Sequence, residues 1–168
     1  MKLKYLVLLA VSGAVISLDQ MSKLLVIKRL LLHESIPVID GIFNLTYVHN
    51  PGAAFGLLSK MDPSFRVPFF VIVPVIALIL IVLFFRKIDD RDTMTALALS
   101  LIIGGAIGNL IDRASYGYVV DFFEIYWKEV FRYPAFNVAD SAICIGAALL
   151  AIETFRKEKQ RKNAPGTA

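Results

Sequence analysis

Two aspartates of this sequence stand in apolar surroundings, where a carboxylate is costly. Asp121 lies between pairs of valine and phenylalanine in the run VVDFF, and Asp140 lies at the start of a long apolar stretch. Ionisable groups in such positions usually face a partner, a cavity or a reaction. Two neighbouring carboxylates at low dielectric cannot both ionise cheaply, so the pair shares a proton. Such a pair can activate water against a carbonyl group, which is the chemistry of an aspartyl peptidase.

Other polar residues lie at the same expected membrane depth as these aspartates, near the ends of apolar segments. Asp19 and Lys23 are four residues apart and share a helix face, and Asn109 and Arg113 have the same spacing. Taken alone, the first pair is typical of a structural ion pair, and Arg113 can extend its side chain to lipid headgroups. Their common depth indicates that they converge on one site.

The acid at the last apolar stretch also has a purely structural interpretation. Asn137 and Asp140 have the spacing of a helix capping box, and a helix N-terminus favours a negative charge. Capping needs one acid, however, and does not account for Asp121. The sequence therefore predicts that Asp121 and Asp140 work together, whether or not Asn137 also caps the helix.

Composition places these residues in an integral membrane protein. Of the 168 residues, 57% are hydrophobic and 19% are charged, and the mean hydropathy is +0.67. The apolar residues form four blocks, each about long enough to cross a bilayer core; they are residues 5–26, 67–85, 93–111 and 138–155. We expect a single all-α membrane domain, residues 1–168, in which glycines of the third block form a face for close helix packing. The first block also resembles a secretory signal peptide, but three spans follow it, which favours an uncleaved helix.

The basic residues predict how the four helices are oriented. An even number of spans puts both termini on one side of the membrane. The 27 residues on that side, 1–4, 86–92 and 153–168, include ten Lys and Arg. The 77 residues counted on the other side, helix ends included, are 19–66 and 112–140, and they include only eight. The denser side is expected to be cytoplasmic. Residues 27–66 and 112–137 then form extracytoplasmic loops, and the polar tail 156–168 is cytoplasmic and, by its composition, disordered.

Two local predictions concern the extracytoplasmic loops. Residues 41–59 mix β-forming residues with a turn signal at residues 50–52, which favours a short strand or hairpin as a small β-type region. After Asp121, aromatic and aliphatic residues recur at helical spacing, which favours a short amphipathic helix lying in the membrane interface. An aromatic belt that anchors the loop ends explains the same residues equally well.

Five motifs occur in the order found in one known family. DQMSK begins at Asp19, NPGAAFG at Asn50, GGAIGNLIDR at Gly104, VVDFF at Val119 and FNVADS at Phe136. In this order, and with four spans, they resemble the bacterial lipoprotein signal peptidases, also called signal peptidase II. The resemblance extends from the first motif to the end of the fourth span.

The resemblance implies an intramembrane aspartyl endopeptidase that removes the signal peptide from diacylglyceryl-modified prolipoproteins, cutting just before the lipid-modified cysteine. By residue matching, Asp121 and Asp140 are the catalytic dyad, which acts through an activated water without a cofactor or a metal ion. The residues implied to bind substrate or support the dyad are Asp19, Lys23, Asn50, Gly52, Ala53, Ala54, Phe55, Asn109, Arg113 and Asn137.

The resemblance also implies a setting and partners. The expected location is the bacterial cytoplasmic (inner) membrane, with several passes, both termini in the cytoplasm and the active site toward the outer leaflet. The expected partners are prolipoprotein substrates, membrane lipid and cyclic-peptide inhibitors of the globomycin type.

A small transporter or channel and a non-enzymatic scaffold are the rival classes. Transporters usually place polar groups near the bilayer midplane, whereas here they lie at one end of the helices. A scaffold leaves the cost of two buried acids unexplained. The net charge of +4 is not arranged as a nucleic-acid-binding face, and His33 and His49 are not placed at the spacing of metal ligands.

Overall fold

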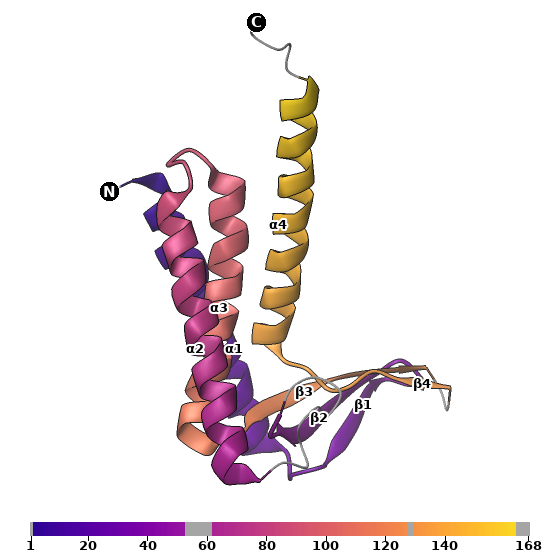
Figure 1. Ribbon diagram of the computed structural model, residues 1–168. Helices are drawn as coiled ribbons and strands as arrows, with labels where there is room; N and C mark the ends of the chain where they lie inside the picture. Colours follow the sequence, from indigo (N-terminus) through magenta and orange to yellow (C-terminus); the bar gives the residue numbers. More distant parts are fainter. Residues whose placement is uncertain (1, 53–61, 128–129, 164–168) are drawn as a thin grey trace, which may run out of the picture.

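In the part of the chain that the structure describes, four long helices form the body of the molecule (Figure 1). The structure, a computed structural model, describes residues 2–52, 62–127 and 130–163. Each helix is long and apolar enough to cross a membrane and contains residues of one of the four apolar blocks. They are α1 (Leu3–Arg29), α2 (Pro63–Lys87), α3 (Thr93–Tyr116) and α4 (Val138–Asn163). The chain is therefore an integral membrane protein.

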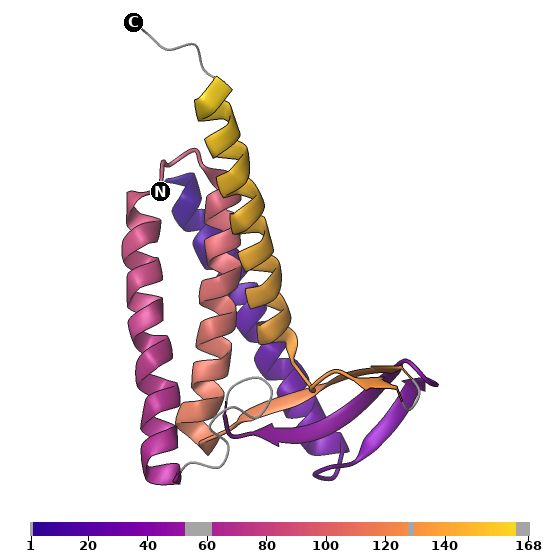
Figure 2. The same ribbon diagram turned by 45° about the vertical axis from the view of Figure 1, so that its right-hand side comes forward.

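The central helix of the bundle is α3, which packs against each of the other three. Figure 2 shows it between α2 and α4, with α1 behind. Close approach depends on glycine, because a Cβ at Gly108 would lie 2.6 Å from the Asp19 Oδ2. At Gly105 a Cβ would overlap the carbonyl oxygen of Ala139 at the start of α4. The glycines predicted to form a packing face therefore bring the N-terminal end of α4 and the outer part of α1 against α3.

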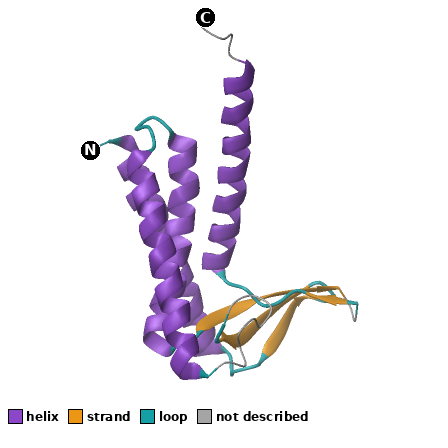
Figure 3. Cartoon of the chain, in the orientation of Figure 1, coloured by secondary structure: helices purple, strands orange, loops and turns teal. Residues whose placement is uncertain are grey.

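Among the described residues a four-stranded sheet lies at the end of the helices opposite both termini and projects to one side of the bundle (Figures 1 and 3). Its strands, in spatial order, are β1 (Ser35–Ile39), β2 (Phe43–Asn50), β3 (Val119–Trp127) and β4 (Phe131–Arg132). Strands β2 and β3 are antiparallel, with Val48 opposite Asp121 and Asn50 opposite Val119. Strand β2 lies within the segment predicted to form a strand or hairpin, whose residues 53–59 lie outside the described part of the chain.

An apolar cluster attaches the sheet to the end of α1. It joins Val26 of α1 and Leu30, the C-cap residue of that helix, to Tyr47 of β2 and to Val120 and Phe122 of β3. All five side chains are buried, and removing them from water holds β3 against the bundle. Because Val120 and Phe122 flank the first predicted acid, this cluster fixes the strand that carries it.

The prediction of an amphipathic helix after Asp121 is wrong. The segment forms β3 and, beyond residues 128–129, β4. Valine and aromatic residues favour a strand as strongly as they mark a helix face. Pairing with β2 decides between the two, because it satisfies the backbone groups of both strands. The all-α expectation is corrected accordingly to four helices and a sheet, with Trp127 and Phe131 exposed at its outer end.

The prediction of a disordered tail, residues 156–168, is wrong as far as Asn163, where α4 ends. Charged residues one turn apart support this part of the helix, as in the 2.8 Å ion pair between Glu158 and Lys162. Lys157 bonds to the carboxylate that caps the N-terminus of α3. These contacts carry α4 beyond its apolar block.

Candidate active site

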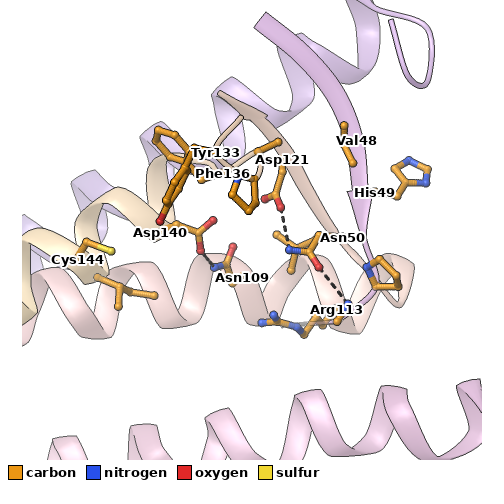
Figure 4. Close-up of a pocket in the computed structure, with 16 residues that line it drawn as sticks. Val48, His49, Asn50, Asn109, Arg113, Asp121, Tyr133, Phe136, Asp140 and Cys144 are labelled. Carbon is orange, nitrogen blue, oxygen red and sulfur yellow. Dashed lines mark hydrogen bonds between the residues drawn. The ribbon is translucent and has the colours of Figure 1, made fainter. Parts of the chain in front are cut away.

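A cavity of about 420 Å³ lies where the sheet meets α3 and α4 (Figure 4). Asp121 and Asp140 both line it, so the structure brings the two predicted acids to one place. The remaining walls come from the end of β2, from α3 and from the segment before α4. The lining residues are Val48, His49, Asn50, Pro51, Gly52, Asn109, Arg113, Val119, Asp121, Tyr133, Pro134, Ala135, Phe136, Asp140, Ile143 and Cys144.

Asp121 is held on β3 by two amide donors. Its Oδ2 accepts a 2.9 Å hydrogen bond from Asn50 Nδ2 (Figure 4). Its Oδ1 accepts one of 2.7 Å from Asn137 Nδ2. The register of the sheet explains the first contact, since Asn50 pairs with Val119 and is therefore the diagonal neighbour of Asp121 on the same face. The side chain is only 2% exposed.

The surroundings of Asp121 raise its pKa from the ordinary value of 3.8 to about 7. Burial is the main cause, because removal from water disfavours the charged form, and the charge of Asp140 adds to the shift. The donors from Asn50 and Asn137 act in the opposite direction, since they stabilise the ionised carboxylate. Asp121 therefore holds a proton up to about neutral pH.

Asp140 lies in the first turn of α4, where it forms a capping box with Asn137. The backbone N–H of Asn137 donates to Asp140 Oδ2 at 3.2 Å, and the backbone N–H of Asp140 donates to Asn137 Oδ1 at 2.9 Å. Asn109 Nδ2 donates to Asp140 Oδ1 at 2.8 Å. The capping prediction is thus confirmed. The same contacts present Asp140 to the cavity.

Asn137 contacts both acids. Its side-chain amide donates to Asp121 Oδ1, and its backbone N–H donates to Asp140 Oδ2. The same Nδ2 lies 3.2 Å from the Oδ1 of Asn109 and 3.3 Å from the carbonyl oxygen of Val120. The side chain is fully buried. A single residue therefore fixes the two carboxylates relative to each other.

Arg113 lines the cavity beside the two acids. Its guanidinium carbon lies 5.7 Å from the ring centroid of Phe70 on α2, a cation–π arrangement, and the charge of Asp140 attracts it. Within the described part of the chain no hydrogen bond joins it to either acid. Its fork of donors is thus available to a carbonyl group in the cavity.

Asp19 and Lys23 lie behind the cavity rather than in it. They form the predicted ion pair, at 2.7 Å, and Lys23 Nζ also lies 3.0 Å from the Oδ2 of Asp112. Gln20 Nε2 donates to the other oxygen of Asp112 at 2.9 Å. We call Asp19, Gln20, Lys23 and Asp112 the Lys23 cluster. It touches the site through Asn109, whose Oδ1 accepts a 3.0 Å hydrogen bond from Lys23 Nζ.

Gly52 lies in the cavity wall, where its N–H donates to Asn50 Oδ1 at 3.1 Å. This bond directs the amide group of Asn50, so that Nδ2 faces Asp121. The next three residues that the resemblance implies to bind substrate or support the dyad, Ala53, Ala54 and Phe55, lie outside the described residues.

Two members of the Lys23 cluster, Gln20 and Asp112, were missed by sequence reasoning. Asp112 had a usable signal, because it lies three residues after Asn109 and therefore shares its helix face. Gln20 had none, since it follows Asp19 on a helix and reaches Asp112 only through the packing of α1 on α3. Ile143 and Cys144, which line the cavity a turn deeper than Asp140, were also missed as site residues.

The family model described as signal peptidase (SPase) II matches residues 11–156. The chain belongs to the signal peptidase II family. Membership of this family makes the chain a peptidase that cleaves signal peptides in a membrane.

Two bacterial lipoprotein signal peptidases are similar to this signal peptidase II chain over nearly their whole lengths. The lipoprotein signal peptidase of Geobacter sulfurreducens is 50% identical over 161 residues, which cover 96% of this chain and 99% of the relative. That of Geobacter metallireducens is 47% identical over 161 residues, covering 96% and 98%.

A solved structure described as a bacterial membrane enzyme shares the fold of this signal peptidase II chain. It is 33% identical, superposes with a TM-score of 0.82, and the match covers 96% of this chain and 94% of the solved one. The helices and the sheet therefore belong to an arrangement already seen in a bacterial membrane enzyme.

Proposed function

We propose that the protein is an intramembrane aspartyl endopeptidase that removes the signal peptide from diacylglyceryl-modified prolipoproteins, cutting just before the modified cysteine. The observation that carries the proposal is that Asp121 and Asp140 line one cavity while Asn137 bonds to both. Membership of the signal peptidase II family and the names of the relatives support the substrate class.

The two acids play different parts in the proposed reaction. Asp121, whose pKa is about 7, donates its proton toward the oxygen of the scissile carbonyl. Asp140, held by a helix N-terminus and the Asn109 amide, takes a proton from water. The water oxygen then bonds to the carbonyl carbon, giving a tetrahedral diol.

Collapse of the diol completes the reaction. The proton on Asp140 passes to the amide nitrogen as the C–N bond breaks, and a diol hydroxyl returns its proton to Asp121. One water is consumed, the products are a carboxylic acid and a free amine, and the dyad regains its starting state. No redox partner is needed.

The supporting residues are assigned by their contacts. Asn50 and Asn137 hold Asp121, Asn109 holds Asp140, and Gly52 fixes the amide of Asn50. Arg113 binds a carbonyl of the substrate, because its donors are unused within the described residues and its guanidinium lines the cavity.

The membrane sets the direction of approach. A signal peptide is an apolar helix and reaches the cavity laterally through the bilayer, with the lipid of the modified cysteine remaining in the acyl layer. The excess of Lys and Arg on the side of the termini supports a cytoplasmic location for both ends. The cavity, at the other end of the helices, then faces the outer leaflet. Exposed apolar residues on the sheet, including Val38, Trp127 and Phe131, fit a position at the membrane surface.

The test uses the purified protein and a diacylglyceryl-modified prolipoprotein. A gel shift should show the shortened product, and mass spectrometry should place its first residue at the modified cysteine, with the unmodified precursor left uncut. A globomycin-type cyclic peptide should block the cleavage. Cleavage at another bond, equal cleavage of the unmodified precursor, or an absence of cleavage would contradict the proposal.

A further inference from the structure

Lys23 is a buried lysine that is not among the described residues lining the cavity. Its side chain is 2% exposed, and its ammonium group lies 2.7 Å from Asp19 Oδ2, 3.0 Å from Asp112 Oδ2 and 3.0 Å from Asn109 Oδ1. These three contacts use its three donors. Burial of three charged groups is costly, and a hydrophobic replacement of such a cluster is often as stable. A contribution to folding stability is therefore a weak explanation for the burial of these charged residues.

Each carboxylate of the cluster also binds one backbone amide. Asp112 Oδ2 accepts a 3.0 Å hydrogen bond from the N–H of Val120, and Asp19 Oδ1 accepts one of 2.9 Å from the N–H of Ala139. Val120 directly precedes Asp121, and Ala139 directly precedes Asp140. The two acids of the cluster thus hold the backbone immediately before each acid of the dyad.

Lys23 joins these two attachments and also orients Asn109. Because the ammonium donates to Asn109 Oδ1, the amide must present Nδ2 to Asp140, as it does at 2.8 Å. A flipped amide would place its NH₂ group against the ammonium and its oxygen against a carboxylate. Lys23 thereby excludes the amide orientation in which Asn109 cannot donate a hydrogen bond to Asp140.

We propose that Asp112 and Lys23 are positioning residues of the dyad, which set the distance and relative orientation of Asp121 and Asp140 from behind. This inference rests on the proposed function. Asp112 holds the β3 side through Val120, Asp19 holds the α4 side through Ala139, and Lys23 connects the two. Neither positioning residue touches the substrate.

The test compares Asp112→Ala with Asp112→Asn. The alanine variant leaves the Asp19–Lys23 ion pair intact, so no uncompensated buried charge remains, but it frees the Val120 N–H. We expect kcat to fall about 10²-fold, since small displacements of reacting groups cost about that much. KM should change little, and the pH profile should shift because the coupling between the two acids changes. The asparagine variant keeps an oxygen acceptor for Val120 and should recover most of the loss.

Lys4→Met provides the matched control. Lys4 is also a lysine of α1, 3% exposed and paired with an aspartate, Asp90 at 3.0 Å, but it lies at the end of the helix remote from the cavity. Its loss should lower the thermal stability and leave both kcat and the pH profile unchanged. Asp112→Ala with a wild-type kcat and pH profile would overturn the inference, and so would an asparagine variant as impaired as the alanine variant.

Further variants distinguish a failure of the positioning role from a failure of the proposed function. If Asp112→Ala does not accumulate in the membrane, Asp112→Asn with an Asp112→Leu comparison decides by the same kcat criterion. If either Asp121→Asn or Asp140→Asn retains wild-type cleavage, the dyad itself is wrong. If they are inactive while Asp112→Ala is fully active, only the positioning role fails.

Discussion

The amide of Asn50 gives the sharpest prediction about the dyad. Asn50→Ala removes the 2.9 Å donor to Asp121 Oδ2 while the donor from Asn137 remains. A hydrogen bond to a carboxylate favours its charged form, so losing the bond raises the pKa of Asp121 further. In the proposed reaction Asp121 must be protonated, and activity falls as the pH rises through its pKa of about 7. The alkaline limb of the kcat/KM profile should therefore move to higher pH in the variant.

The size of the shift follows from the strength of the lost bond. Hydrogen bonds to charged groups contribute about 1.5–3 kcal/mol, and one pKa unit corresponds to about 1.4 kcal/mol. The full loss amounts to about one to two pKa units. Asn50 lines the open cavity, where water can replace part of its bond. We therefore expect the lower end of this range, about one unit.

The assay is the initial rate of cleavage of a modified prolipoprotein at subsaturating concentration, measured across neutral pH, because kcat/KM reports the free enzyme. Asn44→Ala is the matched control. Asn44 also lies on β2 and donates to a carboxylate of β3, Glu124 at 2.8 Å, away from the dyad. It should leave the alkaline limb in place. An unmoved limb in Asn50→Ala, or a limb displaced to lower pH, would refute the role given to Asp121.

Three more predictions concern packing, charge and metal ions. Gly105→Ala should lower the thermal stability in the membrane, because its Cβ would overlap the Ala139 carbonyl, whereas Gly13→Ala, with nothing within 4 Å, should not. Asp121→Asn should raise Tm at neutral pH but not near pH 4. The folded pKa of Asp121 lies above its ordinary 3.8, so the proton stabilises the fold fully below about pH 4, and this stability is lost as the pH rises through about 7. A Tm gain that persists at pH 4 would contradict the assigned pKa. Treatment with a metal chelator should leave cleavage intact, since the two carboxylates supply both proton transfers, and a loss restored by added metal would count against the mechanism.

The helices and the composition of the site could be predicted because both depend on local pattern. Four apolar blocks imply four helices wherever a bilayer is the solvent. Polar residues near the ends of these blocks lie at one depth in the membrane, so they could be predicted to meet. In the structure Asp121, Asp140, Asn109 and Arg113 line one cavity. The capping of α4 was equally local, because the spacing of Asn137 and Asp140 defines it.

The sheet could not be predicted in full because strand pairing is not local. Aromatic residues after Asp121 fit a helix face and a strand alike, and only the partner strand decides. The contact between Asn50 and Asp121 depends on the β2–β3 register, which shifts between Leu45 and Val48. That irregularity leaves no mark in a single sequence.

The Lys23 cluster shows a second limit. The pairing of Asp19 with Lys23 follows from helix spacing, but Asp112 joins them only because glycines let α1 and α3 approach closely. Its hydrogen bond to the backbone before Asp121 requires the chain to return from α3 along β3. Such contacts follow from tertiary packing and have no sequence pattern of their own.

The most direct test of the dyad is the cleavage rate of Asp121→Asn and of Asp140→Asn, each compared with Asp40→Asn. Asp40 is an exposed aspartate between β1 and β2 and serves as the control. Each dyad variant should insert into the membrane and lose cleavage of the modified prolipoprotein by about 10²- to 10⁴-fold or to below detection, as expected when a general acid or base is removed. The control should cleave at the wild-type rate. Wild-type cleavage by either dyad variant would contradict the two-aspartate mechanism.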